Sequence, residues 1–275
     1  MGDIIITGAS RGIGRALALA LAHRPLESRR LLLVARDQTR LDQVAQQARA
    51  AGAIALVVAG DLSTVTGARA LGEKLAAVAQ RPTLLVHNAG LWPTRRELTA
   101  DGFEQAYAVN CVGPLLVQQR LLAAGVVDRV MVVSAGLIAL GKFSAQHTPT
   151  GADFSLWRTY CSTKLAFALA EIDVAAAATA IDFVALHPGV VATDLGVARG
   201  LLGGLLRFAK HVLETPEKCA QRLRVLLDKE RWSPAGEVRW YHEDQERPWP
   251  TAARDEQARR DVRAALQAHM ASLSR

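Results

Sequence analysis

The amino-acid sequence predicts an α/β fold, with helices on both faces of one doubly wound parallel sheet of about seven strands. Two observations carry this prediction. Short apolar runs alternate with longer segments of helical periodicity along the chain. The runs are continuously apolar, as in parallel strands that are buried on both faces. Because no linker or repeat interrupts this order, we expect the 275 residues to form a single domain.

The expected strands are continuously apolar runs of about five residues. They cover residues 3–7, 31–35, 54–58, Thr83–His87, 129–134, 181–187 and, as a seventh strand, 237–241. The expected helices are rich in strong helix formers such as alanine and leucine. They cover residues 12–23, 38–51, 65–79, 103–109, 112–124, 155–178, 216–230 and 251–273. Thr215 and Pro216 suit the N-cap and first position of the helix that follows.

Composition excludes several classes of protein. Half of the residues are apolar, 21% are charged, and the mean hydropathy is +0.12. A chain of this kind buries a sizeable core and is neither disordered nor collagen-like. The cysteines, Cys111, Cys161 and Cys219, are too few and too dispersed for a disulfide framework or a metal site. We therefore expect no metal and a reducing, cytoplasmic location. We also expect no membrane anchor or signal peptide, because no apolar run is long enough to span a membrane and Asp3 precedes the first one.

The net charge of +7 would suit a nucleic acid or an acidic membrane as partner. However, the basic residues are scattered singly or in pairs such as Arg95-Arg96 and Arg259-Arg260, and they form no long run. We expect no nucleic-acid partner. The charge is better explained by an arginine-rich surface and by a pocket for a polyanionic cofactor.

A glycine-rich turn follows the first expected strand and opens the first expected helix. It reads TGASRGIG, with Gly8, Gly12 and Gly14 in the spacing G-x-x-x-G-x-G. Glycines allow a tight turn and a close approach of the backbone to a ligand, while the helix start presents free N–H groups to a pyrophosphate. This predicts a Rossmann-type dinucleotide site. Its expected contacts are Gly8, Ser10, Arg11, Gly12, Ile13 and Gly14.

The end of the second expected strand indicates which dinucleotide binds. An acidic residue there favours NAD, because it binds the adenosine ribose. Here the strand ends at Arg36, whose guanidinium can bind a 2′-phosphate, and Arg11 could reach the same group. If the strand ends one residue later, Asp37 could take the ribose instead. The sequence therefore favours NADP(H) over NAD(H).

Further motifs lie at the ends of the later strands and in the helices between them. They are Asp61-Leu62, His87-Asn88-Ala89-Gly90, Asn110, Ser134, Tyr160 with Lys164 in YCSTK, and Pro188-Gly189-Val190-Val191-Ala192-Thr193. In this order and spacing the chain resembles the short-chain dehydrogenase/reductase family across essentially its whole length. The interval between Ser134 and Tyr160, and the tail ARDEQARR, are most similar to the retinol-dehydrogenase-type branch.

Tyr160 is the expected general acid or base, and it shares a helix face with Lys164. A tyrosine has a pKa of about 10, and we expect the Lys164 ammonium to lower it. The resemblance implies further roles. Lys164 holds the nicotinamide ribose, and Asn110 holds a water that relays protons. The remaining contacts to the cofactor would come from Asp61, Leu62, Asn88, Ala89, Gly90, Pro188, Gly189, Val191 and Thr193.

One position departs from the related branch, which usually has two serines where this chain has Ser134-Ala135. In strict register the alanine occupies the place of the catalytic serine. Either Ser134 takes over the contact with the substrate carbonyl, or the site works with a weaker contact. A donor of this kind is worth about 10²–10³ in rate.

We therefore expect an NADP(H)-dependent oxidoreductase. The alternative is a non-catalytic redox sensor with the same fold, although such sensors tend to lack the tyrosine and lysine. The apolar, glycine-punctuated residues 195–213 are expected to form a lid, with Trp92 and Trp157 nearby. An apolar lid suits a hydrophobic carbonyl or secondary alcohol as substrate. Homodimeric and homotetrameric assemblies both remain open.

Overall fold

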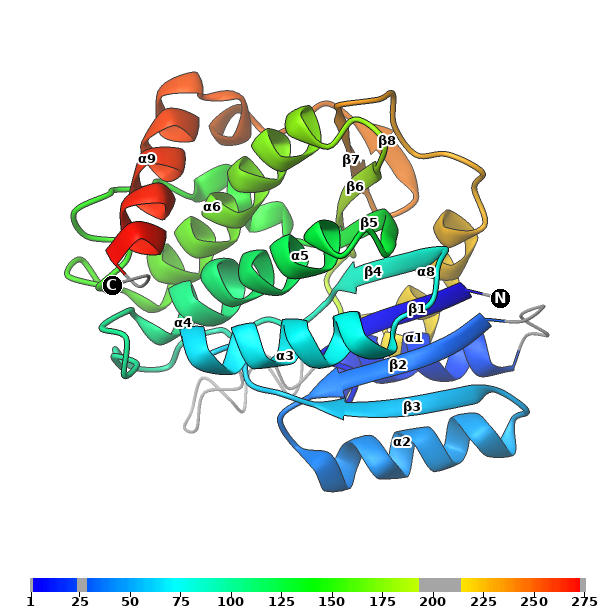
Figure 1. Ribbon diagram of the computed structural model, residues 1–275. Helices are drawn as coiled ribbons and strands as arrows, with labels where there is room; N and C mark the ends of the chain where they lie inside the picture. The colour runs from blue at the N-terminus through cyan, green and yellow to red at the C-terminus, as the bar shows by residue number, and fades with distance from the viewer. Residues whose placement is uncertain (1, 24–28, 193–213, 273–275) are drawn as a thin grey trace.

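The structure is a computed structural model that describes residues 2–23, 29–192 and 214–272. Its strands form one sheet in the order β3-β2-β1-β4-β5-β6-β7-β8 (Figure 1). The strands are β1 Gly2–Thr7, β2 Arg29–Ala35, β3 Ile54–Ala59, β4 Thr83–His87, β5 Val127–Val133, β6 Asp182–His187, β7 Val238–His242 and β8 Gln245–Arg247. All neighbours are parallel except β7 and β8. The predicted α/β fold is confirmed, with an eighth strand that the sequence did not indicate because β8 is short and exposed.

The helices lie close to their predicted positions. They are α1 Gly12–Ala22, α2 Gln38–Ala50, α3 Val65–Val78, α4 Gln105–Tyr107, α5 Gly113–Ala123, α6 Leu156–Ala177, α8 Pro216–Leu227 and α9 Glu256–Ser272. The separation predicted between 103–109 and 112–124 is wrong, because a π-helical turn, Ala108–Val112, joins α4 to α5. The last predicted helix is likewise divided into a 3₁₀ turn, Thr251–Arg254, and α9. The predicted lid, residues 195–213, lies outside the described residues.

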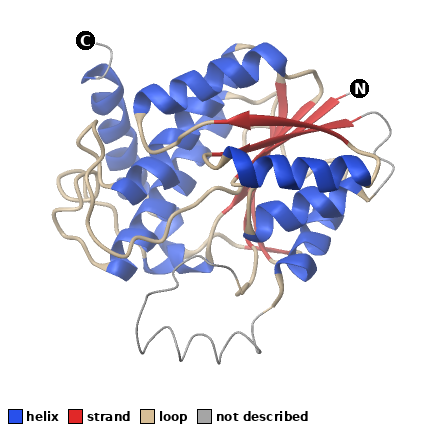
Figure 2. Ribbon diagram, turned by 90° about the horizontal axis from the view of Figure 1, so that it is seen from below, coloured by secondary structure: helices blue, strands red, loops and turns tan. Residues whose placement is uncertain are grey.

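Side chains alternate between the two faces of the sheet, as the pleat of a strand requires. In β1, Ile5 packs into the core that also holds α3, α5 and α6. Ile4 and Ile6 pack into the opposite core, with α1, α2 and α8. Figure 2 shows helices on both sides of the strands. The continuously apolar runs in the sequence follow from this burial on both faces.

The strand order reverses beside β1, which pairs with β2 on one side and β4 on the other. Loops that leave the carboxyl ends of these strands diverge to opposite faces of the sheet, and ligands of open α/β sheets bind at such a point. The glycine-rich turn after β1 therefore lies at the expected place for a ligand.

Among the described helices, none combines the length and the apolar character needed to cross a bilayer.

Candidate active site

The glycine-rich turn has the conformation that its glycines permit. Gly8 and Gly12 have φ angles of +69° and +56°, which side chains other than glycine rarely adopt. A Cβ atom on Gly14 would lie 2.4 Å from both Asn88 Nδ2 and the Gly8 carbonyl oxygen. Arg11 is the N-cap of α1, but its side chain makes no capping hydrogen bond. The first N–H groups of α1 are therefore left for an anion.

Thr7 and Asn88 hold this turn against the loop after β4. Thr7 Oγ1 accepts hydrogen bonds from the backbone N–H groups of Asn88 and Ala89, each at 3.0 Å. Asn88 Nδ2 donates to the carbonyl oxygens of Thr7 and Gly8, at 2.9 and 3.3 Å. Asn88 thus holds the start of the glycine-rich turn through two backbone carbonyl groups. Sequence reasoning missed Thr7, although a hydroxyl directly before the first glycine was a usable signal.

The second strand ends at Ala35, so Arg36 is the first residue beyond it. Its side chain is 63% exposed, and its Nε lies 4.0 Å from Asp61 Oδ1. Asp37 instead caps α2, because its carboxylate accepts a hydrogen bond from the Arg40 N–H at 3.0 Å. The guanidinium of Arg36 is therefore accessible to a ligand, although it lies in a long ion pair with Asp61.

The two residues predicted after β3 have different environments. Asp61 binds its own turn, since its carboxylate accepts from the N–H and the hydroxyl of Ser63 at 3.0 and 2.7 Å. Leu62 is 7% exposed, and its side chain belongs to the core on the α3 and α5 side. Any contact of Leu62 with a cofactor would therefore come from its backbone, and the contact itself stays a prediction.

Tyr160 and Lys164 lie one turn apart on α6, which begins after the N-cap Ser155. Lys164 is buried, and its Nζ donates to the Val133 carbonyl oxygen at 3.1 Å. A Cβ atom on Gly90 would lie 3.3 Å from this Nζ and 3.6 Å from Asn110 Oδ1. The structure thus brings Lys164, Asn110 and the loop after β4 together.

Asn110 occupies the π-helical turn between α4 and α5, a feature that is frequent at functional sites. Its Oδ1 accepts from the Leu91 N–H at 2.7 Å. Its Nδ2 donates to the Leu91 carbonyl oxygen and to Thr163 Oγ1, at 2.9 and 3.1 Å. The side chain of Asn110 therefore anchors the loop after β4 to α6.

Burial determines the protonation of the Tyr160 and Lys164 pair. It raises the pKa of Tyr160 well above its usual value, and the neighbouring Cys161 thiol adds to the shift. This direction is opposite to the lowering that we predicted from Lys164, because the phenolate is costly in an apolar environment. Burial also lowers the pKa of Lys164 to about 8. At neutral pH, Tyr160 is therefore a protonated phenol that can donate.

Ser134 follows β5 directly, and its hydroxyl is buried with no hydrogen-bond partner among the described residues. Its N–H donates to the Leu186 carbonyl oxygen at 2.8 Å, which holds the backbone against β6. Ala135 is also buried. A buried hydroxyl without a partner is costly unless a ligand or water satisfies it.

The loop after β6 is held by a charged cluster. Gly189 has a φ of +90°, and the Pro188 carbonyl oxygen accepts from Arg222 Nη2 at 2.7 Å. Arg222 also pairs with Glu214, and it lies 3.5 Å from Glu243. Val191 forms an isolated bridge with Glu214. Thr193 lies outside the described residues.

A chain of buried hydrogen bonds behind the site was not predicted from the sequence. His87 Nε2 lies 2.7 Å from Gln118 Oε1, and Gln118 Nε2 donates to both oxygens of Glu171 at 2.9 and 3.1 Å. Burial raises the pKa of Glu171 to about 8, although the bond from Gln118 opposes the shift. Burial lowers the pKa of His87 to about 4. An acidic residue within the apolar run of α6 was the available signal.

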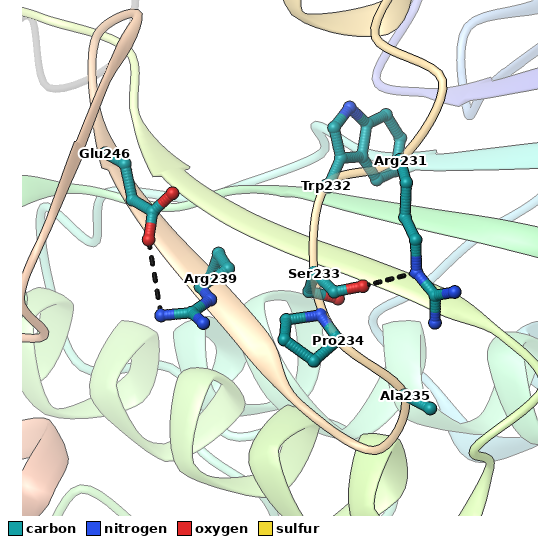
Figure 3. Close-up of a pocket in the computed structure, with 7 residues that line it drawn as sticks. All are labelled: Arg231, Trp232, Ser233, Pro234, Ala235, Arg239 and Glu246. Carbon is teal, nitrogen blue, oxygen red and sulfur yellow. Dashed lines mark hydrogen bonds and ion pairs between the residues drawn. The ribbon is translucent and has the colours of Figure 1, made fainter.

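A pocket of about 610 Å³ lies elsewhere, at the amino end of β7 (Figure 3). It is lined by Arg231, Trp232, Ser233, Pro234, Ala235, Arg239 and Glu246. Its charged groups are bound within the protein: Arg239 lies 3.3 Å from Glu246, and Arg231 Nε donates to the Ser233 carbonyl oxygen at 2.6 Å. The site around Tyr160 is at the opposite, carboxyl end of the parallel strands. This pocket is therefore separate from it.

The residues around the glycine-rich turn fit a dinucleotide. A Cβ atom at Gly8 or Gly14 would collide with the loop after β4 or with the turn itself, so these glycines allow the close packing that shapes the turn, and the N–H groups at the start of α1 stay uncapped. The buried Ser134 hydroxyl, which has no partner among the described residues, follows β5, two strands away from β1 in the sheet. No cluster of three or more histidine, cysteine or acidic side chains suited to a metal occurs in the described part of the chain.

Comparisons with known proteins agree with this geometry. A family described as short chain dehydrogenase matches residues 3–200. Human retinol dehydrogenase 13 is 29% identical, with 94% of this chain and 81% of the relative covered. Human retinol dehydrogenase 12 is 32% identical over 79% of this chain and 70% of the relative. An alcohol dehydrogenase from the archaeon Thermococcus sibiricus, solved with 5-hydroxy-NADP, is 25% identical with a TM-score of 0.64, covering 90% of this chain and 99% of that one.

Proposed function

The chain belongs to the short-chain dehydrogenase/reductase family and is an oxidoreductase, and from that premise we propose that it reduces a hydrophobic carbonyl compound with NADPH. The observation that carries this proposal is the pair formed by Tyr160 and Lys164 on one face of α6. Both side chains are buried, at the carboxyl end of the sheet where the loops after β4 and β5 meet.

A bound nicotinamide would supply the hydride, so the protein must supply orientation and a proton. Tyr160 is suited to donate that proton to the oxygen of the substrate carbonyl, because burial keeps its phenol protonated. Lys164 lies within reach of the same region, where its ammonium would stabilise the phenolate left after proton transfer. Ser134, with its unpartnered hydroxyl, is the candidate donor to the developing oxyanion.

Asn110 supports this arrangement from the loop after β4. It binds both backbone groups of Leu91, so it holds the polypeptide that leads from Gly90 to Trp92. We retain the proposal that it holds a water between Lys164 and solvent. Oδ1 has a second lone pair for that water, since Leu91 uses one.

The proposed cofactor is NADPH because of the residues that follow β1 and β2. Arg36 is exposed directly after β2, while Asp37 is engaged as a helix cap. Arg11 is exposed in the glycine-rich turn. A guanidinium binds a 2′-phosphate and would not favour the ribose hydroxyl that NAD presents. The NADP analogue in the archaeal alcohol dehydrogenase supports the same choice.

The substrate is proposed to be hydrophobic because large apolar side chains are exposed around the carboxyl ends of β5 and β6. These are Leu140, Leu156, Trp157 and Val190. The retinol dehydrogenases among the relatives support an apolar substrate as well. We keep a cytoplasmic location and a homodimer or homotetramer as predictions.

Steady-state kinetics test the proposal. The purified chain is assayed with NADPH and with NADH against a panel of apolar ketones and aldehydes. We expect turnover, with kcat/KM at least about tenfold higher for NADPH than for NADH. NADH lacks the 2′-phosphate, so it would lose the charge-assisted contact with the guanidinium. Tight NADPH binding without turnover of any carbonyl or alcohol would instead favour a redox sensor.

A further inference from the structure

We propose that Trp157 makes this site selective for flat aromatic ketones, by stacking its exposed indole on a ring conjugated to the reacting carbonyl. This inference rests on the proposed function of Tyr160. Trp157 lies three residues before Tyr160 on α6, so both side chains project from neighbouring positions on one helix face. Trp157 is 60% exposed, so its indole offers a flat apolar surface to a ligand.

The ring of Trp157 packs against a second tryptophan, Trp92. The rings of Trp92 and Trp157 are nearly perpendicular, at 86°, with centroids 4.8 Å apart. Trp92 in turn stacks on Tyr160, with centroids 4.2 Å apart and 23° between the planes. The three aromatic rings therefore form one contact series, which ends at the exposed Trp157.

Hydrogen bonds and burial of neighbouring residues fix the positions of Trp92 and Trp157. Trp92 follows Leu91, whose N–H and carbonyl groups are both bound by the Asn110 side chain. Pro93, the next residue, is buried. Trp157 itself lies in the first turn of α6, which Ser155 caps by accepting from the Arg158 N–H at 3.3 Å. A platform held in this way loses little conformational freedom when a ligand stacks on it.

The chemistry of the indole favours an aromatic ligand over a saturated one. A flat ring stacks on an indole face with a gain beyond the burial of apolar area. A puckered, saturated ring of the same size buries similar area without that gain. In an aryl ketone the ring is attached directly to the carbonyl carbon, so it lies beside Tyr160 when the carbonyl oxygen meets the hydroxyl. Trp157 lies three residues before Tyr160 on α6 and is linked to it through Trp92, so its exposed indole is the surface on which we place that ring.

The experiment compares α-tetralone with 1-decalone, which share a carbon skeleton and differ in one aromatic ring. kcat/KM with NADPH is measured for wild type, Trp157→Leu and Trp157→Phe. Each effect is expressed relative to wild type on the same ketone, so that differences in intrinsic reactivity cancel. We expect Trp157→Leu to lower kcat/KM for α-tetralone about three- to tenfold, and that for 1-decalone less than about twofold. Trp157→Phe should retain most of the activity on α-tetralone.

Val225→Ala is the control, because Val225 is an exposed apolar residue on another helix, α8, and belongs to no part of the proposed site. It should affect the two ketones equally. Equal losses of both ketones in Trp157→Leu, or a Trp157→Phe variant as impaired as Trp157→Leu, would overturn the inference.

A binding measurement separates this inference from the proposed function. Calorimetry with NADP⁺ and either ketone reports affinity without turnover. Weaker binding of α-tetralone, but not of 1-decalone, to Trp157→Leu supports the stacking role even if neither ketone is reduced. Equal binding of α-tetralone to wild type and Trp157→Leu overturns the stacking role, even where both ketones are reduced.

Discussion

Trp92 lies flat against Tyr160, with their ring centroids 4.2 Å apart. The two residues come from different elements, the loop after β4 and the helix α6, so this contact joins the cofactor side of the site to the proposed acid. It also leaves Tyr160 only 5% exposed. The same burial raises the pKa of the phenol, so the contact favours the protonated form that reduction requires.

Replacing Tyr160 by phenylalanine removes the proton donor and keeps the ring. We expect kcat to fall by at least about 100-fold, the range of general acid catalysis, while NADPH binding stays close to wild type. Turnover is measured under saturating NADPH, and affinity by fluorescence titration. Tyr107→Phe is the control, because Tyr107 is also buried and its hydroxyl has no partner among the described residues. Activity of Tyr160→Phe within tenfold of wild type would remove Tyr160 from its assigned role.

Lys164 is proposed to act on both the cofactor and Tyr160. Lys164→Met keeps most of the side-chain volume but loses the charge and the bond to the Val133 carbonyl oxygen. We expect both weaker NADPH binding and a lower kcat, each by about tenfold or more. Lys229→Met, which also loses one hydrogen bond, to Tyr241 at 3.2 Å, serves as the control. A change in only one of the two quantities would contradict the double role.

Arg36→Asp tests the choice of cofactor. The carboxylate would repel a 2′-phosphate and accept a ribose hydroxyl, so the ratio of kcat/KM for NADPH over NADH should fall by about tenfold or more. Arg40→Asp is the control, since it makes the same change of charge at a nearby exposed position on α2. Equal ratios in wild type and Arg36→Asp would show that Arg36 is a surface residue without a role in binding.

The pair Ser134-Ala135 is tested by two reciprocal substitutions. If the Ser134 hydroxyl contacts the substrate carbonyl, Ser134→Ala should lower kcat about 10²- to 10³-fold, because a hydrogen-bond donor to the developing oxyanion is lost. We expect Ala135→Ser to leave turnover equal or faster. A silent Ser134→Ala combined with a faster Ala135→Ser would mean that the enzyme works without a serine donor. If both are silent, the carbonyl does not lie at this strand end.

Glu171→Gln tests the buried chain behind the site through the pH dependence of stability. The pKa of Glu171 is raised from 4.5 to about 8 in the folded protein. The stability contributed by its protonated form is therefore complete below about pH 4.5 and is lost as the pH rises through about 8. We expect the stability of wild type relative to Glu171→Gln to fall with a slope of up to about 1.4 kcal/mol per pH unit in this interval.

Urea denaturation at several pH values measures this slope. Taking the difference between wild type and variant cancels the other titrating groups, His87 and Lys164 included. Glu230→Gln, at an exposed position after α8, controls for the loss of a glutamate as such. A difference that stays constant between about pH 5 and 8 would show that Glu171 is charged in the folded protein.

The sequence by itself determined the features that depend on local physics. The apolar runs predicted seven of the eight strands because the central ones are buried on both faces and the edge strand β3, although partly exposed, is also apolar. The glycine-rich turn was predictable because only glycine readily adopts the positive φ of Gly8 and Gly12. The four-residue spacing of Tyr160 and Lys164 predicted a shared helix face, because α6 continues through both.

Only the tertiary structure decided the rest, because it depends on contacts between segments far apart in the chain. The pKa of Tyr160 is raised and not lowered as predicted, since desolvation by the surrounding fold disfavours the phenolate. The partners of Asn110, the stack of Trp92 on Tyr160 and the chain from His87 to Glu171 also join separate elements, and no local periodicity encodes such contacts.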